Sequence, residues 1–86
     1  MQKHEAKIRG IWYLDSGCSR HMTGGASLFN SIIWEEKGYV KFGDDGRGKI
    51  IATGTIGMPN SLIENVYLVQ GLKHNLLSIS QLCDKW

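Results

Sequence analysis

The sequence predicts a small, mainly β domain with one short helix near its C-terminus. Several short stretches alternate apolar and polar residues, which is the period of a half-buried strand, and glycine-rich turns separate them. The length of 86 residues predicts a single domain. Hydrophobic residues make up 42% of the chain, which is enough for a core, so we expect a small barrel or a sandwich.

The N-terminal third contains one predicted strand. Residues 1–10 are polar and predict a linker or tail, which leaves 11–86 as the domain. The apolar run 11–14 predicts the first strand. Asp15-Ser16-Gly17 ends this strand in a turn, because Asp and Ser bond to nearby backbone and Gly tolerates positive φ. The mixed stretch that follows predicts no regular element beyond a short helical turn at 27–30.

A hairpin is the clearest local signal in the second half. Residues 38–42 alternate at period two, a turn rich in Gly and Asp follows, and 49–57 return as a strand. A further strand is predicted at 62–69. The segment 75–83 mixes apolar and polar residues, and Ser80 could cap a short helix that runs to the end.

Charge and cysteine content exclude several classes of protein. The net charge of +2 is too small to indicate nucleic-acid binding on electrostatic grounds. Cys18 and Cys83 are too few and too far apart for a disulfide framework, so we expect free thiols in a reducing compartment. Neither a signal peptide nor an apolar run of membrane-spanning length is present in the sequence. These features predict a cytoplasmic or nuclear protein without a membrane partner.

The segment that suggests chemistry is Leu14-Asp15-Ser16-Gly17-Cys18. An apolar strand that ends in Asp-Ser-Gly is how an aspartic protease presents its catalytic carboxylate. Gly17 lets the chain turn so that amides can face the carboxylate, and the Ser16 hydroxyl can lock the turn against a partner. The triplet is also a common turn sequence. Aspartic protease chemistry uses two carboxylates that share one proton, so a chain with one triplet would need a second copy of itself.

Two longer strings resemble the protease segment of copia-type LTR retrotransposon Pol polyproteins. They are WYLDSGCSRHMTG at 12–24 and GLKHNLLSISQLC at 71–83. They occur in the order that the family shows, with the Phe42-Gly43-Asp44 turn between them, and the resemblance covers 11–86. It implies a retropepsin-like closed β-barrel that acts as a homodimer and cuts its own polyprotein.

The resemblance also implies roles for individual residues. Asp15 would be the catalytic aspartate, with Ser16 and Gly17 completing its turn. The hairpin at 39–53 resembles the flap over the cleft, and its tip would comprise six residues: Gly43, Asp44, Asp45, Gly46, Arg47 and Gly48. Three residues resemble the segment that supports the active-site loop: Leu76, Leu77 and Ser78. At the last of these positions retroviral enzymes usually have glycine. No metal and no cofactor are implied.

One departure from the family's pattern concerns the C-terminus. A retropepsin continues past its helix into a strand that builds the dimer sheet, whereas this sequence ends at Trp86. We therefore expect a C-terminal truncation, which bears on dimerisation. A non-catalytic β-barrel relic or interaction module stays open as an alternative to the protease. A nucleic-acid-binding piece is a weaker alternative, and nucleic acid is not expected as a partner of this domain.

Other constellations are poorer candidates for a site. Four residues could supply zinc ligands: Cys18, His21, His74 and Cys83. Their spacings match no common zinc finger, and we expect the two histidines to make structural hydrogen bonds instead. A hydrolase pair of Ser16 and His21 lacks the nucleophile elbow. The Asp44-Asp45-Gly46 turn lacks the ligand series of a calcium loop.

Overall fold

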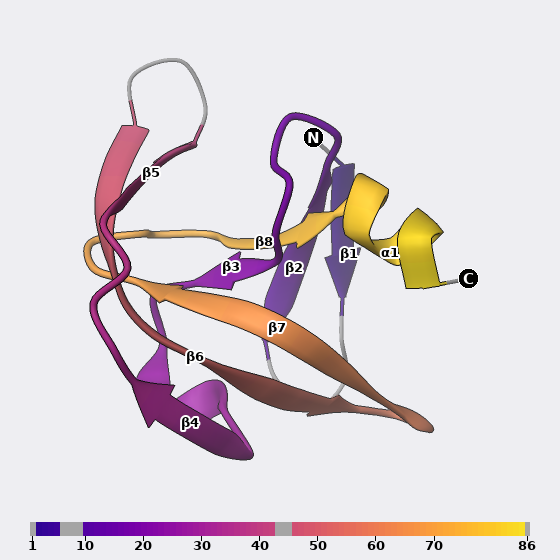
Figure 1. Ribbon diagram of the computed structural model, residues 1–86. Coiled ribbons are helices and arrows are strands. Elements are labelled where there is room, and N and C mark those ends of the chain that lie inside the picture. Colours follow the sequence, from indigo (N-terminus) through magenta and orange to yellow (C-terminus); the bar gives the residue numbers. More distant parts are fainter. Residues whose placement is uncertain (1, 6–9, 43–45, 86) are drawn as a thin grey trace.

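The computed structural model of the chain describes residues 2–5, 10–42 and 46–85 (Figure 1). Its strands follow the order β1-β2-β8-β3-β7-β6-β4 in one sheet, and β5 pairs with β6 beside this path. The strands are β1 (Gln2–Glu5), β2 (Ile11–Asp15), β3 (Met22–Thr23), β4 (Ser31–Trp34), β5 (Tyr39–Phe42), β6 (Gly46–Met58), β7 (Ser61–Val69) and β8 (Asn75–Ser78). The helices are the 3-10 turn η1 (Ala26–Leu28) and the α-helix α1 (Ile79–Lys85).

The prediction of a mainly β fold with one short C-terminal helix is confirmed. Within the described ranges, the hydrogen-bonded path has two ends, β1 and β4, so main-chain hydrogen bonds do not close the barrel. The curvature comes from the long strand β6, whose pairing with β7 shifts register between Ile50 and Ala52 and again between Gly54 and Ile56. Such irregularities bend a strand and increase its twist, which lets β6 serve both the β5 hairpin and the β7 ribbon (Figure 1).

The pair that positions the candidate site is β2 with β8. The two strands run parallel, in a register that places Trp12 beside Asn75 and Asp15 beside Ser78. Parallel neighbours need a long crossover connection, and here the whole hairpin region lies between them in sequence. The strand β3 then pairs with both β8 and β7. The two strings that carry the family resemblance therefore lie side by side in space.

The core consists of two clusters on opposite sides of β8. Leu77 belongs to one cluster with Trp12, and Leu76 belongs to the other with Met22. Neighbouring residues of a strand face opposite sides, so β8 is buried on both faces. The first cluster contains Trp12, Ile56, Ile63, Val66 and Leu77; the second contains Cys18, Met22, Ile50, Val69 and Leu76. Each fully buried large apolar side chain contributes about 1.5–3 kcal/mol to folding.

Most of the predicted elements are present, with small shifts of their bounds. The hairpin prediction is confirmed, because β5 pairs antiparallel with β6 from Tyr39 opposite Lys49 to Phe42 opposite Gly46. The strand predicted at 62–69 is β7. The helical turn expected at 27–30 is η1, one residue earlier, and no element was expected where β4 forms. No helix in the described ranges has the length and hydrophobicity needed to cross a bilayer.

No strand was predicted in residues 1–10, but the structure has one there. Residues Gln2–Glu5 form β1, which pairs antiparallel with β2, placing Gln2 opposite Leu14 and Glu5 opposite Ile11. The stretch is polar and has no period of two, so the sequence carried no strand signal. A strand at the edge of a sheet needs only main-chain partners on one side, and β2 supplies them.

Candidate active site around Asp15

Asp15 is the last residue of β2 and begins a tight turn. Its side chain is half-buried, and its Oδ1 accepts a hydrogen bond from the backbone amide of Gly17 at 2.7 Å. A Cβ at position 17 would stand 3.1 Å from that oxygen, so glycine permits this close approach. Ser16 and Gly17 are both exposed. The expectation that an amide of the turn faces the carboxylate therefore agrees with the geometry.

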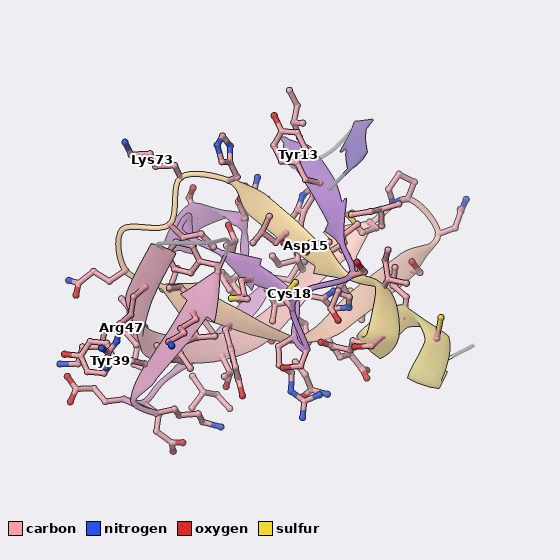
Figure 2. All side chains as sticks on the ribbon, turned by 90° about the horizontal axis from the view of Figure 1, so that it is seen from above. Tyr13, Asp15, Cys18, Tyr39, Arg47 and Lys73 are labelled. Atoms are coloured by element: carbon pink, nitrogen blue, oxygen red, sulfur yellow. The ribbon has the colours of Figure 1, made fainter. Side chains whose placement is uncertain are left out.

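Cys18 follows the turn and bonds back to the main chain of Asp15. Its thiol is buried and donates to the carbonyl oxygen of Asp15, with 3.5 Å between sulfur and oxygen. Figure 2 shows the two side chains close together near the centre of the molecule. Burial, and to a smaller extent the negative charge of Asp15, raise the pKa of the Cys18 thiol to about 11. The thiol is therefore neutral at physiological pH and acts as a small buried donor.

Ser78 connects this turn to the second string. It lies beside Asp15 in the parallel register and is fully buried. Its hydroxyl donates to the carbonyl oxygen of Cys18 at 2.7 Å and accepts from the amide of Gln81 at 3.1 Å. The second bond makes Ser78 the N-cap of α1, so the expectation that Ser80 caps this helix was wrong. Ser80 instead contacts the Ser78 hydroxyl, at 3.1 Å.

His21 is inserted into this helix cap. In a capping box of the Ser-x-x-Gln type, the Gln side chain reaches back to the amide of the cap residue. Here Nδ1 of His21 accepts that amide hydrogen of Ser78 at 2.9 Å, and Oε1 of Gln81 accepts the backbone amide of His21 at 2.9 Å. The ring is only 3% exposed. The expected structural role of His21 is confirmed.

A second set of bonds joins the two strings at their other ends. Thr23, which is fully buried, donates its hydroxyl to Oδ1 of Asn75 at 2.6 Å. Nδ2 of Asn75 donates to the carbonyl oxygen of Ile11 at 3.0 Å. The carbonyl of Leu72 packs so closely on Gly24 that a Cβ there would clash with it. The strings are thus complementary halves of one structural unit that backs the Asp15 turn.

The residues assigned to the flap tip are placed in part. Gly43, Asp44 and Asp45 lie outside the described residues. The other three, Gly46, Arg47 and Gly48, are paired residues at the start of β6 and so flank the tip. The guanidinium of Arg47 lies 5.0 Å from the ring centre of Tyr39 on the outer face of the hairpin. In Figure 1, this hairpin and the loop that follows β2 rise on the same side of the molecule.

The remaining histidine and cysteine positions do not converge on a common point. The ring of His74 meets the ring of Tyr13 edge to face, with 5.2 Å between their centres. Cys83 is exposed on α1, whereas Cys18 and His21 are buried. Across the part of the chain that the structure describes, no three or more His, Cys, Asp or Glu side chains are arranged to hold a metal ion. A zinc site thus has no support in the described geometry.

Comparison with known families decides where this fold and these two strings belong. The model of one family, described as "Pol polyprotein, beta-barrel domain", matches residues 12–86. The chain belongs to this family. Searches of curated proteins and of solved structures gave no match. Membership confirms the expected origin in a retrotransposon Pol polyprotein and the β-barrel fold. The match to a Pol beta-barrel domain begins at Trp12, the residue that opens the first string.

The sequence analysis did not assign Gln81 or Thr23 to the site. Gln81 could have been found, because Ser78 and Gln81 have the spacing of a capping box directly before a helix. Thr23 carries no such local signal, since its partner Asn75 is 52 residues away and pairs with it only in the folded chain.

Proposed function

We propose that this Pol beta-barrel domain is the aspartic endopeptidase of a copia-type retrotransposon polyprotein. It would act as a homodimer in which each copy contributes one Asp15. The observation that carries the proposal is the geometry of the Asp15 turn. The carboxylate stands at a strand end, only half-buried, and Oδ1 is fixed by the Gly17 amide at 2.7 Å. No other residue in the described ranges donates a hydrogen bond to it, so the carboxylate is available for chemistry.

The mechanism follows from placing two such carboxylates face to face. Like charges that close cannot both ionise, so the pair holds one proton between them. The ionised carboxylate takes a proton from a bound water, whose oxygen attacks the peptide carbonyl carbon. The protonated carboxyl donates its proton to the carbonyl oxygen. When the C–N bond breaks, the carboxyl that took the proton from water gives it to the leaving amine, and the other carboxylate takes a proton back from a hydroxyl of the tetrahedral intermediate. This route needs neither a metal nor a covalent intermediate.

The backing of the turn supports a catalytic reading because catalytic groups need fixed positions. Asp15 is held from behind by β8, whose Ser78 lies beside it and binds the carbonyl of Cys18 at 2.7 Å. The turn is therefore braced by buried hydrogen bonds rather than carried on a free loop. A site supported in this way keeps its geometry when a substrate binds.

The hairpin of β5 and β6 would cover the substrate in this proposal. It rises on the same side as the loop after β2 (Figure 1). An extended peptide held beneath it could form main-chain hydrogen bonds, and closure would exclude water. The substrate would be the parent polyprotein at its domain junctions, cut in the cytoplasm or nucleus. Membrane and nucleic acid have no part in this scheme.

A non-catalytic structural or interaction module is the second candidate. It is favoured by the fact that the polar residues of both strings serve the fold: Asn75, Ser78 and Gln81 all bond to the segment 11–23. A Gly17 amide on Oδ1 of Asp15 is also the bond of an ordinary Asx turn. On this reading the strings persist because they hold the barrel together.

Two measurements on the same preparation separate these candidates. Sedimentation equilibrium over a range of concentrations at about pH 5, where a carboxylate dyad holds one proton, tests for the dimer. Digestion of a proteome-derived peptide library, read by mass spectrometry, tests for cleavage. We expect a concentration-dependent dimer, cleavage by the natural chain and by Glu64→Gln, which changes an exposed carboxylate elsewhere, and none by Asp15→Asn. A monomer without cleavage, or cleavage that Asp15→Asn retains, would overturn the proposal.

A further inference from the structure

The His21 ring is held in one protonation state by its hydrogen bond. Nδ1 accepts the amide hydrogen of Ser78 at 2.9 Å, and a ring nitrogen that accepts a hydrogen bond carries no proton. The imidazole of the folded chain is therefore neutral, with its ring proton on Nε2. A second ring proton would turn the acceptor into a donor that faces the Ser78 N–H. Since the ring is 3% exposed, water does not replace the lost bond.

The bond to Ser78 connects the ring to the candidate catalytic turn. Ser78 lies beside Asp15 in the parallel register, and its hydroxyl holds the carbonyl of Cys18 at 2.7 Å. The thiol of Cys18 in turn contacts the carbonyl of Asp15. The His21 ring thus reaches the turn through one residue, Ser78.

The main chain of His21 is held independently of its ring. Its amide donates to Oε1 of Gln81 at 2.9 Å, and its carbonyl accepts from the amide of Tyr67 at 2.9 Å. Because these two bonds do not involve the imidazole, loss of the ring contact would loosen Ser78 without unfolding the segment around His21. The ring contact can therefore change while the barrel remains.

Ionisable residues lie on the elements that bond to His21. Described ones are Asp15, Cys18 and Arg20 on its own segment, Glu64 and Tyr67 on β7, and Cys83 on α1. Arg20 and Glu64 are exposed, so water screens their effect on a buried ring. The Cys18 thiol is neutral, since its pKa is raised to about 11. The strand β8 contributes no ionisable group, because its residues are Asn75, Leu76, Leu77 and Ser78.

We propose that His21 is a positioning residue that makes the Asp15 turn sensitive to acid. While the ring is neutral, its Nδ1 accepts the Ser78 amide and so fixes the residue whose hydroxyl binds the carbonyl of Cys18. When the ring is protonated, the bond to the Ser78 amide is lost and Ser78 is released. An unfolded histidine takes up its proton below about pH 6.5. A proton on Nδ1 of the folded chain would break the bond to the Ser78 amide, so the range below this value is where its release is tested. The consequence for activity rests on the proposed function, whereas release of Ser78 is a property of the fold.

Amide hydrogen exchange of Ser78, measured by NMR on the 86-residue chain, tests the release directly. The series runs from pH 7.5 to 4.5, with rates corrected for the intrinsic effect of pH. We expect the protection of Ser78 to fall by about tenfold more than that of Val66, a buried residue of β7, which corresponds to loss of one hydrogen bond. Equal protection of Ser78 at both ends of the series would overturn the proposal.

Two substitutions separate the effect of protonating the ring from the effect of losing its hydrogen-bond acceptor, Nδ1. His21→Asn places an amide oxygen where Nδ1 stands but takes up no proton, so Ser78 should stay protected across the series. His21→Leu removes the acceptor, so protection should be low at every pH. If His21→Leu does not fold, the comparison of the natural chain with His21→Asn still decides. Identical pH dependence in these two proteins would overturn the proposal.

An activity measurement distinguishes this inference from the proposed function. If the chain cleaves peptides, the ratio of the cleavage rate at pH 4.5 to that at pH 6.5 should be higher in His21→Asn than in the natural chain. If His21→Asn cleaves with the same pH dependence as the natural chain although the exchange protection of the Ser78 amide depends on pH, the positioning role is overturned and the proposed function stands. Absence of cleavage in every variant would overturn the proposed function, while the exchange series still tests the release of Ser78.

Discussion

The hydroxyl of Ser78 donates a hydrogen bond to the carbonyl oxygen of Cys18 at 2.7 Å, across 60 residues of sequence. The same hydroxyl accepts the amide of Gln81 at 3.1 Å and so caps α1. One buried oxygen therefore fixes the loop behind Asp15 and the start of the helix together. A glycine at this position would have neither bond, so the serine adds a link of its own to this chain.

Ser78→Ala should destabilise the chain by about 2 kcal/mol, because it removes a helix cap and leaves the carbonyl of Cys18 without its donor. Urea unfolding followed by circular dichroism measures the loss. Ser80→Ala is the matched control, since Ser80 is exposed and its hydroxyl contacts the Ser78 hydroxyl at 3.1 Å. Its cost should stay below about 0.5 kcal/mol. Equal costs for the two variants would contradict the central role given to Ser78.

Gly24→Ala should destabilise the chain by more than about 2 kcal/mol. Its Cβ would clash with the carbonyl oxygen of Leu72, a main-chain atom that cannot rotate away. Gly25→Ala is the neighbouring control, because its Cβ would stand 3.3 Å from side-chain atoms of Leu28, which can adjust. The midpoint of thermal unfolding compares the two. A smaller loss for Gly24→Ala than for Gly25→Ala would show that the contact with Leu72 is not as tight as described.

Asp15→Asn should leave the stability within about 0.5 kcal/mol of the natural chain, because the amide oxygen of Asn can still accept the Gly17 amide. Asp15→Ala loses that acceptor and should cost about 1 kcal/mol. Chemical denaturation of the three proteins checks both values. A large loss in Asp15→Asn would mean that the charge of Asp15 supports the fold, and a lack of activity in that variant would then carry no information about catalysis.

The two thiols should differ strongly in reactivity. Cys18 is buried and its pKa is raised to about 11, so only about one molecule in a thousand carries its thiolate at pH 8. Cys83 is exposed. Iodoacetamide at pH 8, followed by mass spectrometry, should label Cys83 first and leave Cys18 unmodified until urea is added. Equal labelling rates in the folded chain would contradict the burial of Cys18.

The raised pKa of the Cys18 thiol also leads us to expect a loss of stability at alkaline pH. The pKa of Cys18 in the folded chain, about 11, lies above its ordinary value of 9.0, so the folded state holds this proton more tightly than the unfolded state does. The contribution of the neutral thiol to the free energy of unfolding is fully present below pH 9 and is lost as the pH rises through about 11. Cys18→Ala should lack this part of the alkaline loss when unfolding is compared at pH 8 and 10.5. Identical pH dependence of the two proteins would contradict it.

Local patterns predicted the parts of the fold that local interactions decide. The alternation on either side of the Gly- and Asp-rich turn predicted the hairpin of β5 and β6, because the period of two and the turn chemistry both lie within residues 38–57. The Asp15 turn was predicted for the same reason, since Gly17 and Asp15 are two residues apart. The helix was predicted but its cap was misassigned, because both Ser78 and Ser80 satisfy the cap preference and only packing separates them.

The sequence by itself determined a mainly β chain, the place of its hairpin, and an Asp-Ser-Gly turn at the end of a strand. Only the tertiary structure decided that β1 forms on the edge of β2, that β8 lies parallel to β2, and that His21 occupies the cap of α1. The physical reason is sequence distance. A polar edge strand and a histidine facing an amide 57 residues away have no periodic signal, and their partners come within reach only when the whole chain folds.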